Sequence, residues 1–288
     1  MDAATLRARC AAKIAARKVG HFHDHPWLYE AFLSVPREHF VPDVVWWPVQ
    51  DDAGLFPVLD RTAAPDPWLQ AVYDPRTPLI TQIADGAVRP EDGPTDRADF
   101  TSSISCAAVV VDMLHHLDPQ EPDTVLEIGT GTGYSAALLS RRVRADQVVT
   151  VEISPELADH ADHKLDELGV RPLVVTGDGE LGWAARAPYD RVLSTVAVRR
   201  VPQAWLDQTT AGGTILTPLD TPFGHEALLR LVADGKGGAE GHLVTGVSFM
   251  KTRAQRPRRP YAELGWPTWT DYRVTVRDGT QRIWAPRE

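Results

Sequence analysis

The sequence predicts an α/β fold in which a doubly wound, mostly parallel, seven-stranded sheet carries helices on both faces. The first observation is that, from Ser105 onward, short apolar runs typical of buried strands alternate with longer stretches typical of helices. The second is a glycine-rich turn at 129–133, which follows an apolar run and precedes a helical pattern. Ligands bind at the carboxyl ends of the strands in such sheets, so we expect the functional residues at that edge.

The regular region contains strands and helices at spacings that allow one crossover between successive parallel strands. The predicted elements are helix 107–117, strand 124–128, helix 135–143, strand 148–153, helix 155–168, strands 173–176 and 190–195, helix 202–208, and strands 214–219, 227–232 and 242–249. The last two strands are expected to form an antiparallel pair, because the segment that joins them contains the turn-forming glycines 235, 237 and 238.

Residues 1–100 are predicted to form a helical and irregular extension that covers the substrate side of the sheet. Helical patterns occur at 2–18 and 28–40. From 43 to 100 frequent prolines interrupt helical periodicity, so we expect irregular structure with short strands such as 79–83. The α/β domain is then expected at 101–250, and a C-terminal extension at 251–288.

Composition excludes several classes of protein. The net charge of −9 argues against a nucleic-acid partner, because neutralising phosphates requires an excess of cationic side chains. Only two cysteines are present, which fits a reducing cytoplasm and not a disulfide scaffold. No apolar run approaches membrane-spanning length, so we expect a cytoplasmic protein without a membrane partner.

No metal site is predicted. His21, His23 and His25 alternate along the chain, which is suggestive of metal binding. However, the sequence shows no set of cysteines or carboxylates at ligand spacing beside them.

The glycine-rich turn predicts a site for a methyl donor. Its spacing is G-x-G-x-G, whereas a dinucleotide fingerprint would require a glycine at Tyr134. Glu127, two residues before the first glycine, would repel a pyrophosphate but suits the cationic S-adenosylmethionine. The sequence therefore predicts a Rossmann-like class I S-adenosylmethionine-dependent methyltransferase, with S-adenosylhomocysteine as its product.

Two acids that follow later strands complete the predicted donor site. The Glu152 carboxylate can accept hydrogen bonds from both ribose hydroxyls, and Asp178 can accept one from the adenine amine. The predicted donor-binding residues are Glu127, Gly129, Thr130, Gly131, Gly133, Tyr134, Glu152, Ile153, Gly177, Asp178, Gly179 and Thr195.

Several motifs, in order, resemble the protein-L-isoaspartate O-methyltransferases over about residues 27–250. They are Ser34-Val35-Pro36-Arg37-Glu38-His39-Phe40-Val41-Pro42, Ser103-Ile104-Ser105, Val125 to Tyr134, Gly177-Asp178-Gly179, Ala187-Pro188-Tyr189-Asp190, Val201-Pro202-Gln203-Ala204 and Gly212-Gly213. The resemblance implies that Ser105 is the active-site hydroxyl near the transferred methyl, with Ser103 beside it. It also implies that the substrate is an Asp or isoAsp carboxylate of a peptide.

The chain departs from the family's pattern on the substrate side. Cys106-Ala107 replaces a Gln-Pro pair, and Val198-Arg199 replaces an Ala-Pro pair. These departures resemble a subgroup found beside ATP-grasp peptide ligases, which modifies crosslinked ribosomal peptides (graspetides) by methylating an Asp that then cyclises to aspartimide. The expected partners are therefore an acidic, crosslinked peptide and an ATP-grasp ligase system; L-isoaspartyl repair is the alternative.

Individual residues in this region have competing interpretations. Ser105 can be catalytic or can cap the helix that follows it. Arg199 is a candidate counter-ion for the substrate carboxylate, or a solvated loop charge. Cys106 is expected to fill space near the site. The basic run between Lys251 and Arg259 either docks an acidic peptide or forms a solvated tail. A non-catalytic donor-binding module and a small-molecule methyltransferase are further alternatives.

Overall fold

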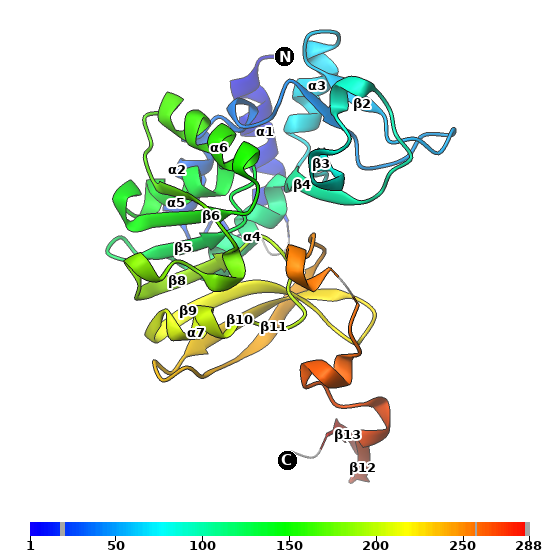
Figure 1. Cartoon of the computed structure of the whole chain (residues 1–288), viewed down its shortest axis with the longest axis vertical. Coiled ribbons are helices and arrows are strands. Elements are labelled where there is room, and N and C mark those ends of the chain that lie inside the picture. The colour runs from blue at the N-terminus through cyan, green and yellow to red at the C-terminus, as the bar shows by residue number, and fades with distance from the viewer. Residues whose placement is uncertain (18–20, 257, 286–288) are drawn as a thin grey trace.

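The computed structural model describes residues 1–17, 21–256 and 258–285. Its main sheet has seven strands in the order β11-β10-β9-β8-β5-β6-β7 (Figure 1). Their bounds are β5 (Val125–Ile128), β6 (Val148–Glu152), β7 (Leu173–Thr176), β8 (Tyr189–Ser194), β9 (Thr209–Asp220), β10 (Glu226–Ala233) and β11 (Ala239–Val247). The pairs from β9 through β8, β5 and β6 to β7 are parallel, whereas β10 is antiparallel to both of its neighbours. The predicted fold class is confirmed.

The N-terminal helices pack on the helices of the α/β domain and share its largest core. The helices are α1 (Ala3–Ala15), α2 (Pro26–Ser34), α4 (Ala107–Leu117), α5 (Tyr134–Arg142), α6 (Pro155–Glu167) and α7 (Gln203–Asp207). α2 contacts α1, α4 and α5, and Leu28, Phe32, Leu114 and Leu138 are all buried in this core. The extension is therefore part of the α/β domain's packing.

The predicted helix at 28–40 is wrong in its second half. α2 ends at Ser34, and Val35 has extended backbone because the ring of Pro36 disfavours helical geometry in the residue before it. A 3₁₀ turn at Arg37–His39 follows. The predicted helix at 2–18 begins and ends inside its expected bounds, and its last expected residue, Lys18, lies outside the part that the structure describes.

A second, four-stranded sheet occupies the region predicted as irregular. Its order is β2-β1-β3-β4, with β1 (Val44–Trp46), β2 (Val58–Asp60), β3 (Leu79–Ile83) and β4 (Phe100–Ile104). The region also contains α3 (Pro65–Val72), which the sequence analysis missed. Pro65 and Pro67 lie in the first turn of that helix, where a missing N–H does no harm. β4 ends immediately before Ser105, so the second sheet fixes where the chain enters the carboxyl edge of the main sheet.

Short 3₁₀ helices complete the structure at Ala84–Gly86, Pro90–Asp92, Ala145–Gln147, Gly179–Leu181, Ala184–Arg186, Arg253–Gln255, Tyr261–Leu264 and Trp269–Asp271. The C-terminal segment first pairs with the loop after β8, through a bridge between Lys251 and Ala197. It then runs out to an exposed hairpin of β12 (Arg273–Arg277) and β13 (Thr280–Trp284), which projects from the body (Figure 1). The division of the chain at residues 100 and 250 stays a prediction.

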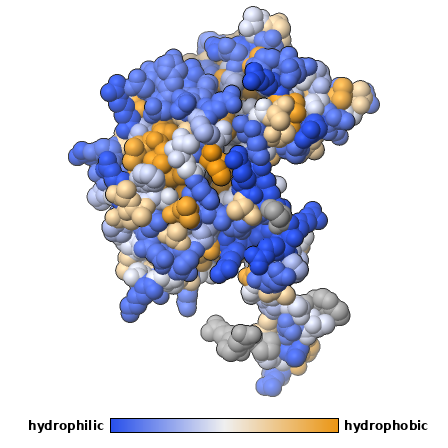
Figure 2. Space-filling model, in the orientation of Figure 1, coloured by the Kyte–Doolittle hydropathy of each residue, from blue (hydrophilic) through white to orange (hydrophobic). Residues whose placement is uncertain are grey.

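The surface is largely hydrophilic in the view of Figure 2, with hydrophobic side chains over part of the α/β domain and a few more over the second sheet. Within the described ranges, no helix is both long and apolar enough to cross a membrane.

Candidate active site

A cavity of about 640 Å³ lies at the carboxyl ends of β5, β6 and β8. This volume lies within the range of small-molecule sites in proteins. The glycine turn, Glu152 and Thr195 line it together with Ser103 and Ser105, and Met250–Arg253 contribute further lining residues. The cavity therefore brings most of the predicted donor residues together with the predicted catalytic serines.

The glycine turn is held tightly against the end of β8. Gly129, Gly131 and Gly133 all have positive φ, at 89°, 54° and 88°, a region that other residues adopt only with strain. A Cβ on Gly129 would lie 2.7 Å from the Thr195 hydroxyl oxygen. That hydroxyl donates to the Gly129 carbonyl at 2.5 Å, so the turn and Thr195 form one rigid unit beside the cavity.

Glu152 is fixed at the cavity wall by backbone N–H groups. Its carboxylate accepts from Gly131 at 2.9 Å and from Ser154 at 3.1 Å. The side chain is only 7% exposed yet lines the cavity together with Ile153. A carboxylate held in this way suits a vicinal diol, which is the group that the ribose of an adenosyl donor presents.

The loop after β7 supplies the second acid. Asp178 is exposed and lines the cavity, and its side chain accepts from the Glu180 N–H at 3.0 Å. A Cβ on Gly179 would lie 2.4 Å from Ile128 Cγ2, so only glycine lets this loop close over β5. Gly177 does not line the cavity; its N–H donates to the Glu152 carbonyl at 2.8 Å and keeps the loop in line with β6.

Glu127 is buried beneath the turn and does not line the cavity. Its carboxylate accepts from the Thr150 hydroxyl at 2.7 Å, and Thr150 is in turn 2.7 Å from the Thr130 hydroxyl. Burial raises the pKa of Glu127 to about 7, an effect to which the charge of Glu152 adds. A nearby cation would favour the ionised form of Glu127. The hydroxyls of Thr150 and Thr130 link this carboxyl group to the cavity wall.

Tyr134 lines the cavity and also packs in the core, whereas Gly133 does not line the cavity. The Tyr134 ring packs against the Arg37 guanidinium, whose central carbon is 5.1 Å from the ring centroid. Its hydroxyl is buried without a hydrogen-bond partner in the described structure. A Cβ on Gly133 would lie 3.3 Å from Ala161 Cβ, which explains the need for a glycine between the turn and α6.

Ser103 and Ser105 approach the turn from the end of β4. A Cβ on Gly131 would lie 3.8 Å from the Ser103 carbonyl oxygen, so the two segments are close neighbours in the cavity wall. The alternative that Ser105 caps α4 is wrong, because the N-cap residue is Cys106 and it makes no side-chain capping bond. Among the described residues the Ser105 hydroxyl has no hydrogen bond, so it can serve a ligand.

Arg37 positions the Ser105 backbone, a role that sequence reasoning missed. The side chain is fully buried and donates from Nη2 to the Ser105 carbonyl at 2.7 Å and from Nε to the Val72 carbonyl at 2.9 Å. An arginine in a motif that also contains Val35, Phe40 and Val41 was the available signal, because a guanidinium buried among such residues must find acceptors.

Arg199 is not brought to the cavity. Its Nε lies 3.3 Å from Asp220 Oδ2, and its guanidinium stacks on Tyr261 with 4.4 Å between the central carbon and the ring centroid. The cations that line the cavity are instead Arg76, Lys251, Arg253 and Arg256. Arg253 and Arg256 both pair with Asp85, at 3.1 and 2.7 Å, and so join the C-terminal segment to the second sheet's edge.

Cys106 also lines the cavity. Burial raises the pKa of its thiol, so the sulfur stays protonated at neutral pH and is a poor nucleophile. This fits a space-filling role.

The comparisons with known proteins agree with this geometry. The family model for protein-L-isoaspartate(D-aspartate) O-methyltransferase matches residues 92–256, more than half of the chain. A protein-L-isoaspartate O-methyltransferase from Staphylothermus marinus is 33% identical over 204 residues, which are 68% of this chain and 72% of that protein. Another, from Ignicoccus hospitalis, is 36% identical over 137 residues, and the match spans 47% of this chain and 65% of the relative, just under two thirds of its length.

Two solved structures share the fold. A protein-L-isoaspartate O-methyltransferase aligns with a TM-score of 0.62 at 22% identity, covering 85% of this chain and 65% of that one. A putative family member from Plasmodium falciparum, in complex with S-adenosyl-L-homocysteine, aligns with a TM-score of 0.59 at 11% identity, covering 88% and 99%. Since the family model spans most of the α/β domain and its cavity, the chain belongs to the protein-L-isoaspartate(D-aspartate) O-methyltransferase family of S-adenosylmethionine-dependent carboxyl methyltransferases.

Proposed function

We propose that this protein methylates the side-chain carboxylate of an Asp in an acidic, ribosomally made and crosslinked peptide, and that the ester then cyclises to aspartimide. One observation carries the proposal: a single cavity joins donor-side residues such as Glu152 to Ser105 and to the cations of its wall. The fit to the donor rests on Glu152, Asp178 and the glycine turn, which offer acceptors and backbone N–H groups without a phosphate-binding pattern.

Methyl transfer to a carboxylate requires mainly that the protein position the substrate oxygen and the methyl donor. When bound, S-adenosylmethionine supplies a methyl group activated by its sulfonium. A substrate carboxylate has an ordinary pKa of about 4, so it is a nucleophile at neutral pH without a general base. Holding its oxygen in line with the methyl can account for roughly 7–11 kcal/mol of the barrier. Ser105 would donate to the carboxylate, and Arg253 and Arg256 would neutralise acidic groups of the peptide.

The second step balances without a further reagent. The new ester carries a methoxy leaving group, and the backbone nitrogen of the following residue attacks its carbonyl carbon. The C–N bond forms, the C–O bond to the methoxy group breaks, and the nitrogen's proton leaves with it as methanol. The result is an aspartimide ring, and no metal is needed.

The alternative function is L-isoaspartyl repair, which the printed names of the relatives favour. The departures at Cys106-Ala107 and Val198-Arg199 favour peptide tailoring, and so does the basic cavity wall contributed by the C-terminal segment. In the tailoring function we expect the protein to act with an ATP-grasp ligase system that makes the crosslinks.

One experiment separates the two functions. The full chain is incubated with S-adenosylmethionine and either short isoAsp peptides of arbitrary sequence or an acidic Asp peptide crosslinked by an ATP-grasp ligase. Mass spectrometry then follows the gain of a methylene and the later net loss of water. We expect rapid turnover of the crosslinked peptide; rapid turnover of isoAsp peptides alone would replace tailoring with repair.

A further inference from the structure

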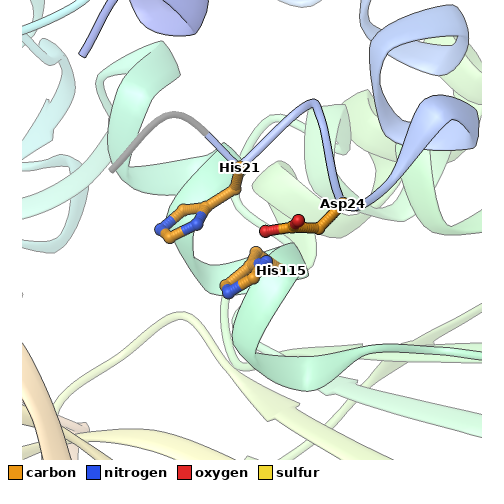
Figure 3. A group of neighbouring side chains, drawn as sticks. All are labelled: His21, Asp24 and His115. Atoms are coloured by element: carbon orange, nitrogen blue, oxygen red, sulfur yellow. The ribbon is translucent and has the colours of Figure 1, made fainter. Parts of the chain in front are cut away.

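A cluster of histidines and carboxylates lies where the N-terminal segment meets the end of α4. His21 and Asp24 belong to the segment between α1 and α2, and His115 lies in the last turn of α4. One ligand atom from each of these residues lies within 4.8 Å of the others. Figure 3 shows the Asp24 carboxylate turned toward the two imidazole rings. None of the three residues lines the active-site cavity.

The His115 imidazole has a nitrogen without a partner. Its Nδ1 is buried and has no hydrogen bond within the described residues. A buried polar atom of this kind needs an explanation, because leaving it unsatisfied costs free energy. A ligand held between the rings and the carboxylate would supply one.

The His21 ring has an acid on its other side. Its Nε2 lies 3.5 Å from Asp112 Oδ1. Asp112 also accepts from Arg17, at 3.1 and 2.9 Å. A carboxylate beside one ring nitrogen favours the proton on that nitrogen and leaves the other, Nδ1, free to coordinate. This pairing of a histidine with an acid behind it is common where histidines bind metals.

We propose that His21, Asp24 and His115 bind a divalent transition-metal ion, of which Zn²⁺ is the best match. Two imidazoles and a carboxylate are a ligand set that Zn²⁺ accepts, with water in the fourth position. The rings are stacked with centroids 3.6 Å apart, so binding turns one ring toward the carboxylate. The ion would tie the N-terminal segment to α4 at a place remote from Ser105.

The sequence did not predict this site, because its ligands are not clustered along the chain. His115 is far from His21 in the sequence, and Asp24 lies between His23 and His25, neither of which is a proposed ligand. His23, which belongs to the alternating set, is exposed and outside the cluster.

The test uses the full chain without a polyhistidine tag, after treatment with a chelator. Co²⁺ is added as a spectroscopic probe, and Zn²⁺ is added in a parallel thermal-unfolding series. We expect one Co²⁺ per chain with ligand-field absorption in the visible range, displacement by Zn²⁺, and a higher Tm with Zn²⁺. Absence of stoichiometric binding would overturn the proposal.

Variants assign the ligands. His21→Ala, Asp24→Asn and His115→Ala should each weaken Co²⁺ affinity at least tenfold and abolish the Zn²⁺ effect on Tm, whereas the matched control His23→Ala should behave as wild type. His21 and Asp24 lie on a loop, so their variants decide the outcome if His115→Ala fails to fold. Unchanged binding in those two variants, or an equal loss in His23→Ala, would refute the assignment.

Discussion

Single residues set the charge of the proposed donor site. Glu127 is buried with a pKa near 7, whereas Glu152 is held at the cavity wall by two backbone N–H groups. The acid beneath the turn is therefore largely protonated in mildly acidic solution, and a cationic ligand at the turn would favour its ionised form. Donor binding and proton release should be coupled.

The first prediction is that donor affinity depends on pH through Glu127. As the pH rises toward 7, affinity for S-adenosylmethionine should increase by up to about tenfold per pH unit, because binding releases one proton from a group whose pKa is raised. Calorimetry across this range would measure it. Glu127→Gln, which cannot ionise, should flatten the dependence; the same slope in both proteins would disprove the coupling.

Ser105 is predicted to act on the substrate and not on the donor. A hydrogen bond to a charged group contributes about 1.5–3 kcal/mol, so Ser105→Ala should lower kcat/KM by about 10- to 100-fold. Affinity for S-adenosylhomocysteine should stay unchanged. An equal loss of donor affinity would reassign Ser105 to a structural role.

At the scale of elements, the strand-turn-helix unit from β5 to α5 is the most demanding part of the fold. Gly129 combines a positive φ with a neighbour that leaves no room for a Cβ. Gly212 in β9 shares the positive φ, at 81°, but has open space around it. A comparison of substitutions at these two glycines therefore distinguishes the effect of backbone strain from the effect of a steric clash.

Gly129→Ala should be more damaging than Gly212→Ala. Positive φ alone costs about 1–2 kcal/mol for a non-glycine residue, and both variants carry that cost. Only Gly129→Ala also displaces Thr195 and the turn, so we expect a lower Tm than for Gly212→Ala together with loss of donor binding. Equal Tm values and intact donor binding in both would contradict the geometry described for the turn.

The elements that sequence predicted well are those with a strong local pattern. Strands such as Leu79–Ile83 and Leu173–Thr176 and the helix Ala107–Leu117 have the bounds expected, because their apolar spacing leaves one interpretation. α3 was missed since its two prolines resemble loop residues until one sees that both occupy the first turn. The short strands β1 and β2 carry too few residues for a period to be seen.

The locations of the proposed site residues could be predicted where a motif fixes the backbone. The turn, Glu152 and Asp178 meet at one edge because parallel strands end there. The cations that line the cavity were predicted less well. Arg199 follows β8 in the sequence, but its contacts with Asp220 and Tyr261, which are distant along the chain, hold it away from the cavity. A local sequence pattern cannot show which of several arginines will be held away from the cavity by an ion pair with a residue distant in the sequence.

At the scale of the whole molecule, the cavity is assembled from three distant parts of the chain: the second sheet, the α/β domain and the segment after β11. Arg253 and Arg256 reach from that last segment to Asp85 beside the second sheet. Figure 2 shows an indentation of the surface between the segment after β11 and the second sheet. Such partly exposed pairs add little stability, about 0–1 kcal/mol, so their arginines can exchange Asp85 for a peptide carboxylate.

The double variant Arg253→Gln and Arg256→Gln should therefore weaken the binding of acidic peptides while leaving donor affinity unchanged. The matched control is Arg273→Gln with Arg277→Gln, which removes the same charge from the projecting hairpin. The KM for an acidic peptide, measured at low and high salt, compares the two double variants. We expect KM to rise in the Arg253/Arg256 variant and to stay unchanged in the control. A larger effect in the control would place peptide recognition on the hairpin.

The most direct test of the central claim is calorimetric titration of the purified full chain with S-adenosylhomocysteine. We expect one site per chain, with binding lost or strongly weakened in Glu152→Ala. Absence of binding to the wild-type protein, or unchanged binding in that variant, would contradict the assignment of this cavity to an adenosyl donor.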